Sequence, residues 1–87
     1  MEKALKIEIV TPQSLIFSGD AVSISLPGSQ SPFQVLTGHV ALVSTLDKGQ
    51  IKIDTGDGRK IFESDGGFAE VNNNVVSVLV ETAEEKV

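Results

Sequence analysis

Apolar and polar residues alternate with a period of two along much of this chain. The alternation holds from Leu5 to Ile9, from Val22 to Leu26 and again from Ile51 to Ile53. Successive side chains of a β-strand point to opposite faces of the sheet, so this period predicts strands with one face on a core and one toward water or a partner. We expect Leu5, Val22 and their alternating apolar partners to face the core.

Turn-forming residues separate these apolar segments at short intervals. Such punctuation is typical of an all-β fold, and it predicts a flattened β-sandwich or barrel of about ten short strands. The strands are expected at 4–10, 14–17, 20–26, 33–36, 40–46, 50–55, 59–63, 67–71 and 75–80, one of them split by a bulge. The turns fall at Thr11-Pro12, Ser18-Gly19-Asp20, Pro27-Gly28, Thr37-Gly38, Lys48-Gly49, Gly56-Asp57-Gly58, Asp65-Gly66-Gly67 and Asn72-Asn73-Asn74.

Three local features carry further expectations. The pair Asp57-Gly58 suits a two-residue hairpin turn, and Gly66-Gly67 indicates a bulge or a close crossing of backbones. Strand 75–80 has apolar residues on both faces, so it is either covered on both sides or presents one face for docking. Only Thr82 to Val87 could begin a helix, and that segment is too short to hold alone. Both Phe62 and Phe68 are expected in the core.

Composition places the chain among small globular proteins with one domain, spanning residues 1–87. Its hydrophobic content is 40%, its net charge is -5 and it has no cysteine. An acidic chain without a basic stripe is repelled by nucleic acid and by anionic lipid. A membrane span needs about 20 consecutive apolar residues, and no run of that length occurs. The amino terminus lacks the apolar block of a signal peptide. These features predict a soluble protein that is cytosolic or peripheral to a larger assembly.

The chain offers little material for catalysis. His39 is the one histidine, and no cysteine exists to pair with it. It lacks further residues at metal-ligand spacing, so it is interpreted either as a corner residue with local contacts or as an interface residue. The acids Asp54, Asp57, Glu63 and Asp65 flank turns. A hydrolase would need two of them to converge in a pocket, whereas solvated turn acids are far commoner. No catalytic, cofactor or metal residue is predicted.

The segment Pro27 to Pro32 is a stiff polar loop. It superficially resembles a phosphate-binding loop, but no GK[ST] sequence or helix follows it. Two interpretations stay open, a plain connector and a binding loop held on a rigid scaffold.

Taken together, these segments resemble the epsilon subunit of the F-type ATP synthase, in its N-terminal β-sandwich domain. The similarity covers about residues 4 to 84. The matching pieces are Ile9-Val10-Thr11-Pro12, Phe17-Ser18-Gly19-Asp20-Ala21, Leu26-Pro27-Gly28, Gly38-His39, Leu46 to Gly49, and Gly66-Gly67-Phe68-Ala69-Glu70-Val71 continuing into Val75 to Glu81.

The resemblance implies a non-catalytic rotor subunit of the central stalk, in the F1 sector. Such a subunit couples the c ring to the gamma subunit, so that hydrogen ion transport drives ATP synthesis. By position, Thr11, His39 and Ser44 fall at the gamma interface, and Gln30, Ser31, Pro32 and Phe33 fall in the loop that faces the c ring. The implied location is peripheral, on the cytoplasmic side of an energy-transducing membrane, most naturally a bacterial inner membrane.

The sequence departs from the family pattern in two regions. Thr37 replaces the usual proline before Gly-His, and Ser31, Pro32 and Gln34 replace the glycines and acid of the ring-facing loop. The chain also stops at Val87, so we expect it to lack the C-terminal helices that inhibit ATP hydrolysis in the family. The alternative function is a free-standing β-sandwich ligand-binding module, for instance for carbohydrate, although the chain has no Trp or Tyr for stacking.

Overall fold

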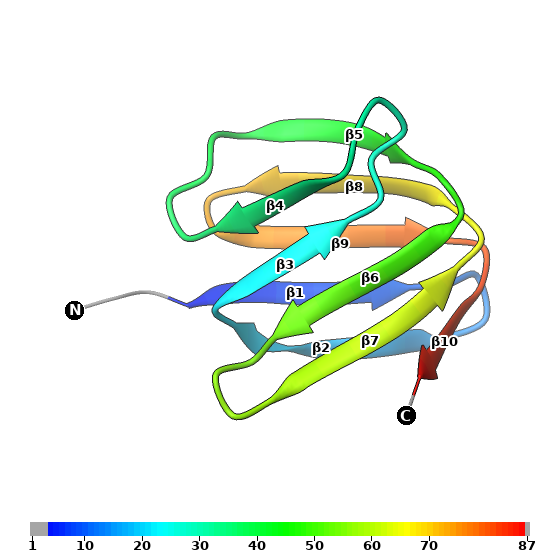
Figure 1. Cartoon of the computed structure of the whole chain (residues 1–87), viewed down its shortest axis with the longest axis horizontal. Helices are drawn as coiled ribbons and strands as arrows, with labels where there is room; N and C mark the ends of the chain where they lie inside the picture. The colour runs from blue at the N-terminus through cyan, green and yellow to red at the C-terminus, as the bar shows by residue number, and fades with distance from the viewer. Residues whose placement is uncertain (1–3, 87) are drawn as a thin grey trace.

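Two five-stranded β-sheets pack face to face in the computed structural model, which describes residues 4–86. Sheet A has the strand order β2-β1-β9-β8-β5, and sheet B has the order β10-β7-β6-β3-β4. In Figure 1 the strands of sheet B run diagonally across those of sheet A. The β-sandwich class predicted from the sequence is therefore confirmed.

All ten elements are short strands, and the described residues contain no helix that is long and apolar enough to cross a membrane. The strands are β1 (Leu5–Val10), β2 (Leu15–Ala21), β3 (Ser23–Leu26), β4 (Phe33–Leu36), β5 (Leu42–Leu46), β6 (Gly49–Asp54), β7 (Arg59–Ser64), β8 (Gly67–Asn72), β9 (Val75–Val80) and β10 (Ala83–Lys86).

The core lies between the two sheets and is built by the predicted alternation. In β1 every second residue is fully buried, namely Leu5, Ile7 and Ile9, and β6 and β9 also bury alternate residues. Phe62 of β7 is also buried, and its ring lies 5.8 Å from that of Phe17 on β2, which joins the two sheets. Each buried Ile, Leu or Phe side chain stabilises the fold by about 1.5–3 kcal/mol.

The turn expected at Ser18-Gly19-Asp20 is absent. Strand β2 runs through it as the antiparallel partner of β1, with Gly19 opposite Ile7. A Cβ atom at Gly19 would lie 3.3 Å from the Phe17 ring, so the glycine leaves room for that ring on the strand. The chain changes sheet at Val22 instead. Val22 is therefore 53% exposed, and its expected place on the core face was wrong.

Within the described residues the C-terminal segment is a strand and not the start of a helix, and Val87, the last residue of the predicted segment, lies outside them. Ala83 to Lys86 form β10, antiparallel to β7, and Ala83 packs against the core. A segment of this length cannot hold a helix alone, whereas the open edge of β7 offers backbone partners for a strand.

The predictions for two glycine-containing turns had different outcomes. The β6–β7 turn has four residues between Asp54 and Arg59, with Gly56 at positive φ. The prediction of a two-residue hairpin turn at Asp57-Gly58 was therefore wrong. The close backbone crossing expected at Gly66-Gly67 is confirmed, because a Cβ atom at Gly67 would collide with the carbonyl oxygen of Leu79.

Phe68 is on the surface and not in the core. Its side chain is 52% exposed on β8, while the neighbouring Ala69 is fully buried. Of the two readings of strand 75–80, the structure supports the one with an open face. Val75 and Leu79 are 40% and 44% exposed on β9.

Candidate docking surface

A continuous row of side chains crosses the outer face of sheet A. Its cross-strand pairs are Thr45 with Phe68, Phe68 with Leu79, Leu79 with Val10, and Val10 with Leu15. Directly opposite residues on adjacent strands have their side chains on the same face and in contact range. We call Thr45, Phe68, Leu79, Val10 and Leu15 the outer row. Four of its five members are apolar and all are at least partly exposed.

The surface beside the middle of the outer row is hollowed. A shallow depression of about 320 Å³ is lined by Val10, Thr11, Pro12, Phe68 and Leu79, with Glu81 at its border. Apolar side chains around an open concavity provide a site for an apolar group of a partner.

Carboxylates lie beside the outer row. The next line of paired residues across sheet A places Glu70 opposite Ser77, and Ser77 opposite Glu8. Glu8 and Glu70 thus lie on the outer face, two residues along their strands from Val10 and Phe68. An apolar strip with acids next to it matches a partner surface that is apolar with basic side chains around it.

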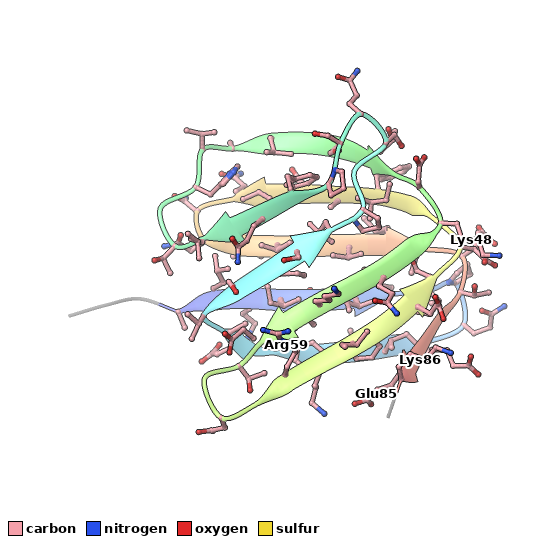
Figure 2. The ribbon with its side chains drawn as sticks, in the orientation of Figure 1. Lys48, Arg59, Glu85 and Lys86 are labelled. Carbon is pink, nitrogen blue, oxygen red and sulfur yellow. The ribbon has the colours of Figure 1, made fainter. Side chains whose placement is uncertain are left out.

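The outer face of sheet B has a different character. Its paired residues include Gln34 with Ser25, Ser25 with Lys52, and Lys52 with Ile61. At the β10 edge, Lys60 pairs with Glu85 at 3.2 Å and Lys86 with Glu63 at 3.1 Å, all half exposed. Figure 2 shows Glu85 and Lys86 beside each other at this edge. Sheet A therefore has the more apolar of the two outer faces.

Thr11 adjoins the hollow beside the outer row. Its side chain is only 7% exposed, and its hydroxyl donates to the Ser14 carbonyl and accepts from the Ser14 N–H, both at 3.2 Å. This pattern closes the turn between β1 and β2. Thr11 therefore shapes the hollow, and its neighbour Pro12 presents the exposed surface there.

His39 lies at the opposite end of sheet A from Thr11, in the connection that leads from β4 to β5. The ring is half-buried and its Nδ1 lies 2.8 Å from the Val40 carbonyl oxygen. A carbonyl can only accept, so Nδ1 is the donor in this hydrogen bond. The adjacent Val40 is 74% exposed.

Ser44 lies on β5 with its side chain on the inward side, between the half-buried Leu42 and the buried Leu46. Its hydroxyl donates to the Thr45 carbonyl at 3.0 Å. Ser44 borders a groove of about 460 Å³ along the open side of the sandwich, which Gln30, Ser31 and Phe33 also line. The three residues expected to meet gamma are thus not a cluster. They mark two ends and one edge of sheet A.

The residues expected to face the c ring occupy one loop. Gln30, Ser31 and Pro32 are exposed, while Phe33 is half-buried and packs against the core. The loop is tied to the end of β5. Ser29 donates from its N–H to the Thr45 carbonyl at 2.9 Å and from its hydroxyl to Asp47 at 3.0 Å. It is therefore a braced loop and not a loose connector.

The turn acids have local partners. Asp54 accepts from the Gly56 N–H at 3.0 Å, Asp65 accepts from the Thr82 hydroxyl at 2.9 Å, and Glu63 pairs with Lys86. Within residues 4–86, no three His, Asp or Glu side chains are grouped so that they could hold a metal ion. These local partners give the three acids a structural role.

Sequence reasoning missed the outer row as a site, although a signal was present. Phe68 and Glu70 are two residues apart on one strand, as are Ser77 and Leu79, so each pair shares a face. Glu70 is charged, so its face is the solvent face, and Phe68 must lie there too.

Comparison with known proteins identifies the family of the chain. The sequence profile of the family "ATP synthase, Delta/Epsilon chain, beta-sandwich domain" matches residues 4–86. The chain belongs to this family. An ATP synthase epsilon chain from Chlorobium limicola is 40% identical to this delta/epsilon family member over 81 residues, which cover 92% of each chain. One from Campylobacter fetus is 45% identical over 80 residues, covering 91% of this chain and 62% of the relative.

Solved structures share the same fold. A chain of the Euglena gracilis mitochondrial ATP synthase, in a structure of OSCP, F1 and c ring, superposes with a TM-score of 0.90. The sequences are 22% identical, and the match covers 98% of this chain and 55% of the other. A chain from the Tetrahymena thermophila central stalk and c ring gives a TM-score of 0.80 at 17% identity, with 95% and 67% covered.

Proposed function

We propose that this protein is a non-catalytic rotor subunit of the F-type ATP synthase, which links the gamma subunit to the c ring. Family membership supports the assignment, and the outer row of sheet A is the structural observation that carries it. A subunit whose role is to transmit force needs partner surfaces on a stiff body, and it needs no reaction centre.

The gamma subunit would cover the outer face of sheet A. Thr11 at one end of that face and His39 at the other are five strand residues or more apart in register, which is roughly 17 Å at 3.3 Å per residue. One partner that touches both would cross β9 and β8, on which Phe68 and Leu79 lie near the Thr11 end. Burial of the outer row would then contribute the apolar centre of the interface, with Glu8 and Glu70 toward its rim.

The c ring would meet the loop Gln30 to Phe33. Because Ser29 is hydrogen bonded to Thr45, this loop is attached directly to a member of the outer row. A displacement of the loop is therefore passed to the gamma-facing sheet through β5 without a flexible segment between them. This arrangement suits a coupling subunit of a rotor that is peripheral to an energy-transducing membrane, on the cytoplasmic side of a bacterial inner membrane.

Mixing the purified chain with purified gamma subunit tests the proposal. We expect a stoichiometric complex at micromolar concentration that elutes as one species in size-exclusion chromatography and buries more than about 1,000 Å². Substituting the outer row should weaken the complex, whereas substituting sheet B residues such as Lys52 should not. Separate elution of the two proteins would contradict the proposed function.

A further inference from the structure

The β8–β9 turn holds the segment that carries His39 by a single side-chain hydrogen bond. The Gly38 N–H donates to Oδ1 of Asn74 at 2.7 Å, across 36 residues of sequence. Asn74 is the last residue of a two-residue turn, because Asn72 and Val75 are paired on the strands. Residues of the same turn thus fix both a sheet A hairpin and the separate connection from β4 to β5.

Few other interactions hold that connection in place. His39 donates from its N–H to the Leu36 carbonyl at 3.2 Å, which closes the connection on itself, and its ring bonds to the adjacent Val40. Among residues 4–86, the Asn74 side chain provides the one side-chain hydrogen bond from residues 37–41 to another part of the fold. Leu36 and Val40 are exposed on either side, so packing does little to hold the segment.

Asn74 is itself held firmly. Its backbone carbonyl accepts from the Lys6 N–H at 2.8 Å, which ties the turn to β1. Asn73 and Asn74 have φ values of 53° and 63°, the left-handed region that asparagine tolerates better than most residues. The turn is fixed by this hydrogen bond and by the pairing of β8 with β9. The Asn74 side chain therefore presents its oxygen at a fixed position.

We propose that Asn74 is a positioning residue for docking, which presets the Gly38–His39–Val40 corner in the conformation that the partner meets. This inference rests on the proposed function, since it takes the His39 corner as part of the gamma interface. A corner ordered before binding loses less conformational freedom on association, so it favours affinity without touching the partner. Loss of the Asn74 acceptor should therefore release the corner and weaken the complex.

The turn offers matched variants. Asn74→Gly removes the acceptor and keeps easy access to positive φ, while Asn74→Asp keeps a side-chain oxygen at the same place. Asn73→Gly makes the same kind of change at the adjacent left-handed position, and the Asn73 side chain has no hydrogen bond within the described residues. Each variant leaves the core strands untouched.

Amide hydrogen exchange of Gly38, followed by NMR in the isolated chain, tests the hydrogen bond itself. We expect Asn74→Gly to speed this exchange by about three- to tenfold, the range for one hydrogen bond, and Asn73→Gly and Asn74→Asp to leave it near the wild-type rate. The dissociation constant for gamma should rise by about three- to tenfold in Asn74→Gly relative to Asn73→Gly.

Two results would overturn the inference. One is unchanged Gly38 exchange in Asn74→Gly, which would mean that the bond does not hold the corner. The other is faster exchange with the same gamma affinity as Asn73→Gly, which would mean that corner order does not matter for docking. A wild-type chain that fails to bind gamma would instead overturn the proposed function, because the exchange measurement needs no partner.

Discussion

Phe68 and Leu79 lie directly opposite each other on β8 and β9, and both side chains are about half exposed, at 52% and 44%. They form the centre of the outer row, with Thr45 beyond Phe68 and Val10 beyond Leu79. Large apolar side chains gathered in one exposed line mark an interaction surface more often than isolated ones do. This pair is where a partner on sheet A would bury the most apolar area.

The two phenylalanines of the β7–β8 region should differ in their effect on stability. Phe62→Ala removes a buried ring and should cost about 3–5 kcal/mol of unfolding free energy. Phe68→Ala removes an exposed ring and should cost less than about 1 kcal/mol, the range of a cross-strand pair. Urea unfolding of both variants measures the difference. Equal losses would place Phe68 in the core after all.

Affinity for gamma should depend on which exposed apolar residue is changed. Leu79→Ser shortens a member of the outer row and should weaken binding about tenfold or more, as expected for a central interface residue. Val22→Ser is the control, since Val22 is also about half exposed, at 53%, but lies at the change of sheet. The affinity of the Val22→Ser variant for gamma should stay near that of the wild type, as measured by titration calorimetry. Equal losses in both variants would argue against the outer row as the docking surface.

His39→Ala should weaken the gamma complex modestly and leave the fold intact. The half-buried ring bonds only to the carbonyl of its neighbour Val40 among the described residues, so little structure depends on it. We expect the melting temperature to fall by less than about 5 °C, the shift that corresponds to 1 kcal/mol in a domain of this size. A larger drop in calorimetry would show that His39 is structural.

Substitution by alanine should destabilise the fold at Gly67 and have little effect at Gly58. Gly67→Ala places a Cβ atom against the Leu79 carbonyl at a φ of 154°, whereas a Cβ atom at Gly58 meets nothing within 4 Å. The first change should destabilise the fold by about 2–4 kcal/mol through overpacking and strain, and the second should fall within about 0.5 kcal/mol of wild type. Thermal unfolding of the two variants checks this contrast, and similar midpoints would contradict the close crossing of β8 and β9.

Much of the fold could be predicted from the alternation, because a buried face repeats every second residue. The prediction that Phe68 lies in the core was wrong because it was based on the size of the side chain. The alternation along the strand points the other way. The small Ala69 fills the core position, and the ring lies outside with Glu70. Likewise Leu79 follows Ser77 to the outer face of β9, so the row could have been derived from its polar neighbours.

The remaining misses depend on partners that the local sequence does not contain. Ala83 to Lys86 carry helix-favouring residues, yet the edge of β7 supplies hydrogen-bond partners that turn them into a strand. Ser18-Gly19-Asp20 reads as a turn, yet pairing with β1 keeps it extended. Nor could sequence place Thr11 and His39 at opposite ends of one sheet, since this follows from the parallel pairing of β1 with β9.

The most direct test of the central claim uses the absence of cysteine from the chain. Ser77→Cys places one thiol on the outer face of sheet A, and Ser25→Cys places one on the outer face of sheet B, both at half-buried positions. The rate of thiol labelling is measured with and without gamma. Docking on sheet A predicts strong protection of the thiol at position 77 and unchanged labelling at position 25. Protection at position 25 alone, or at neither position in a formed complex, would contradict the account.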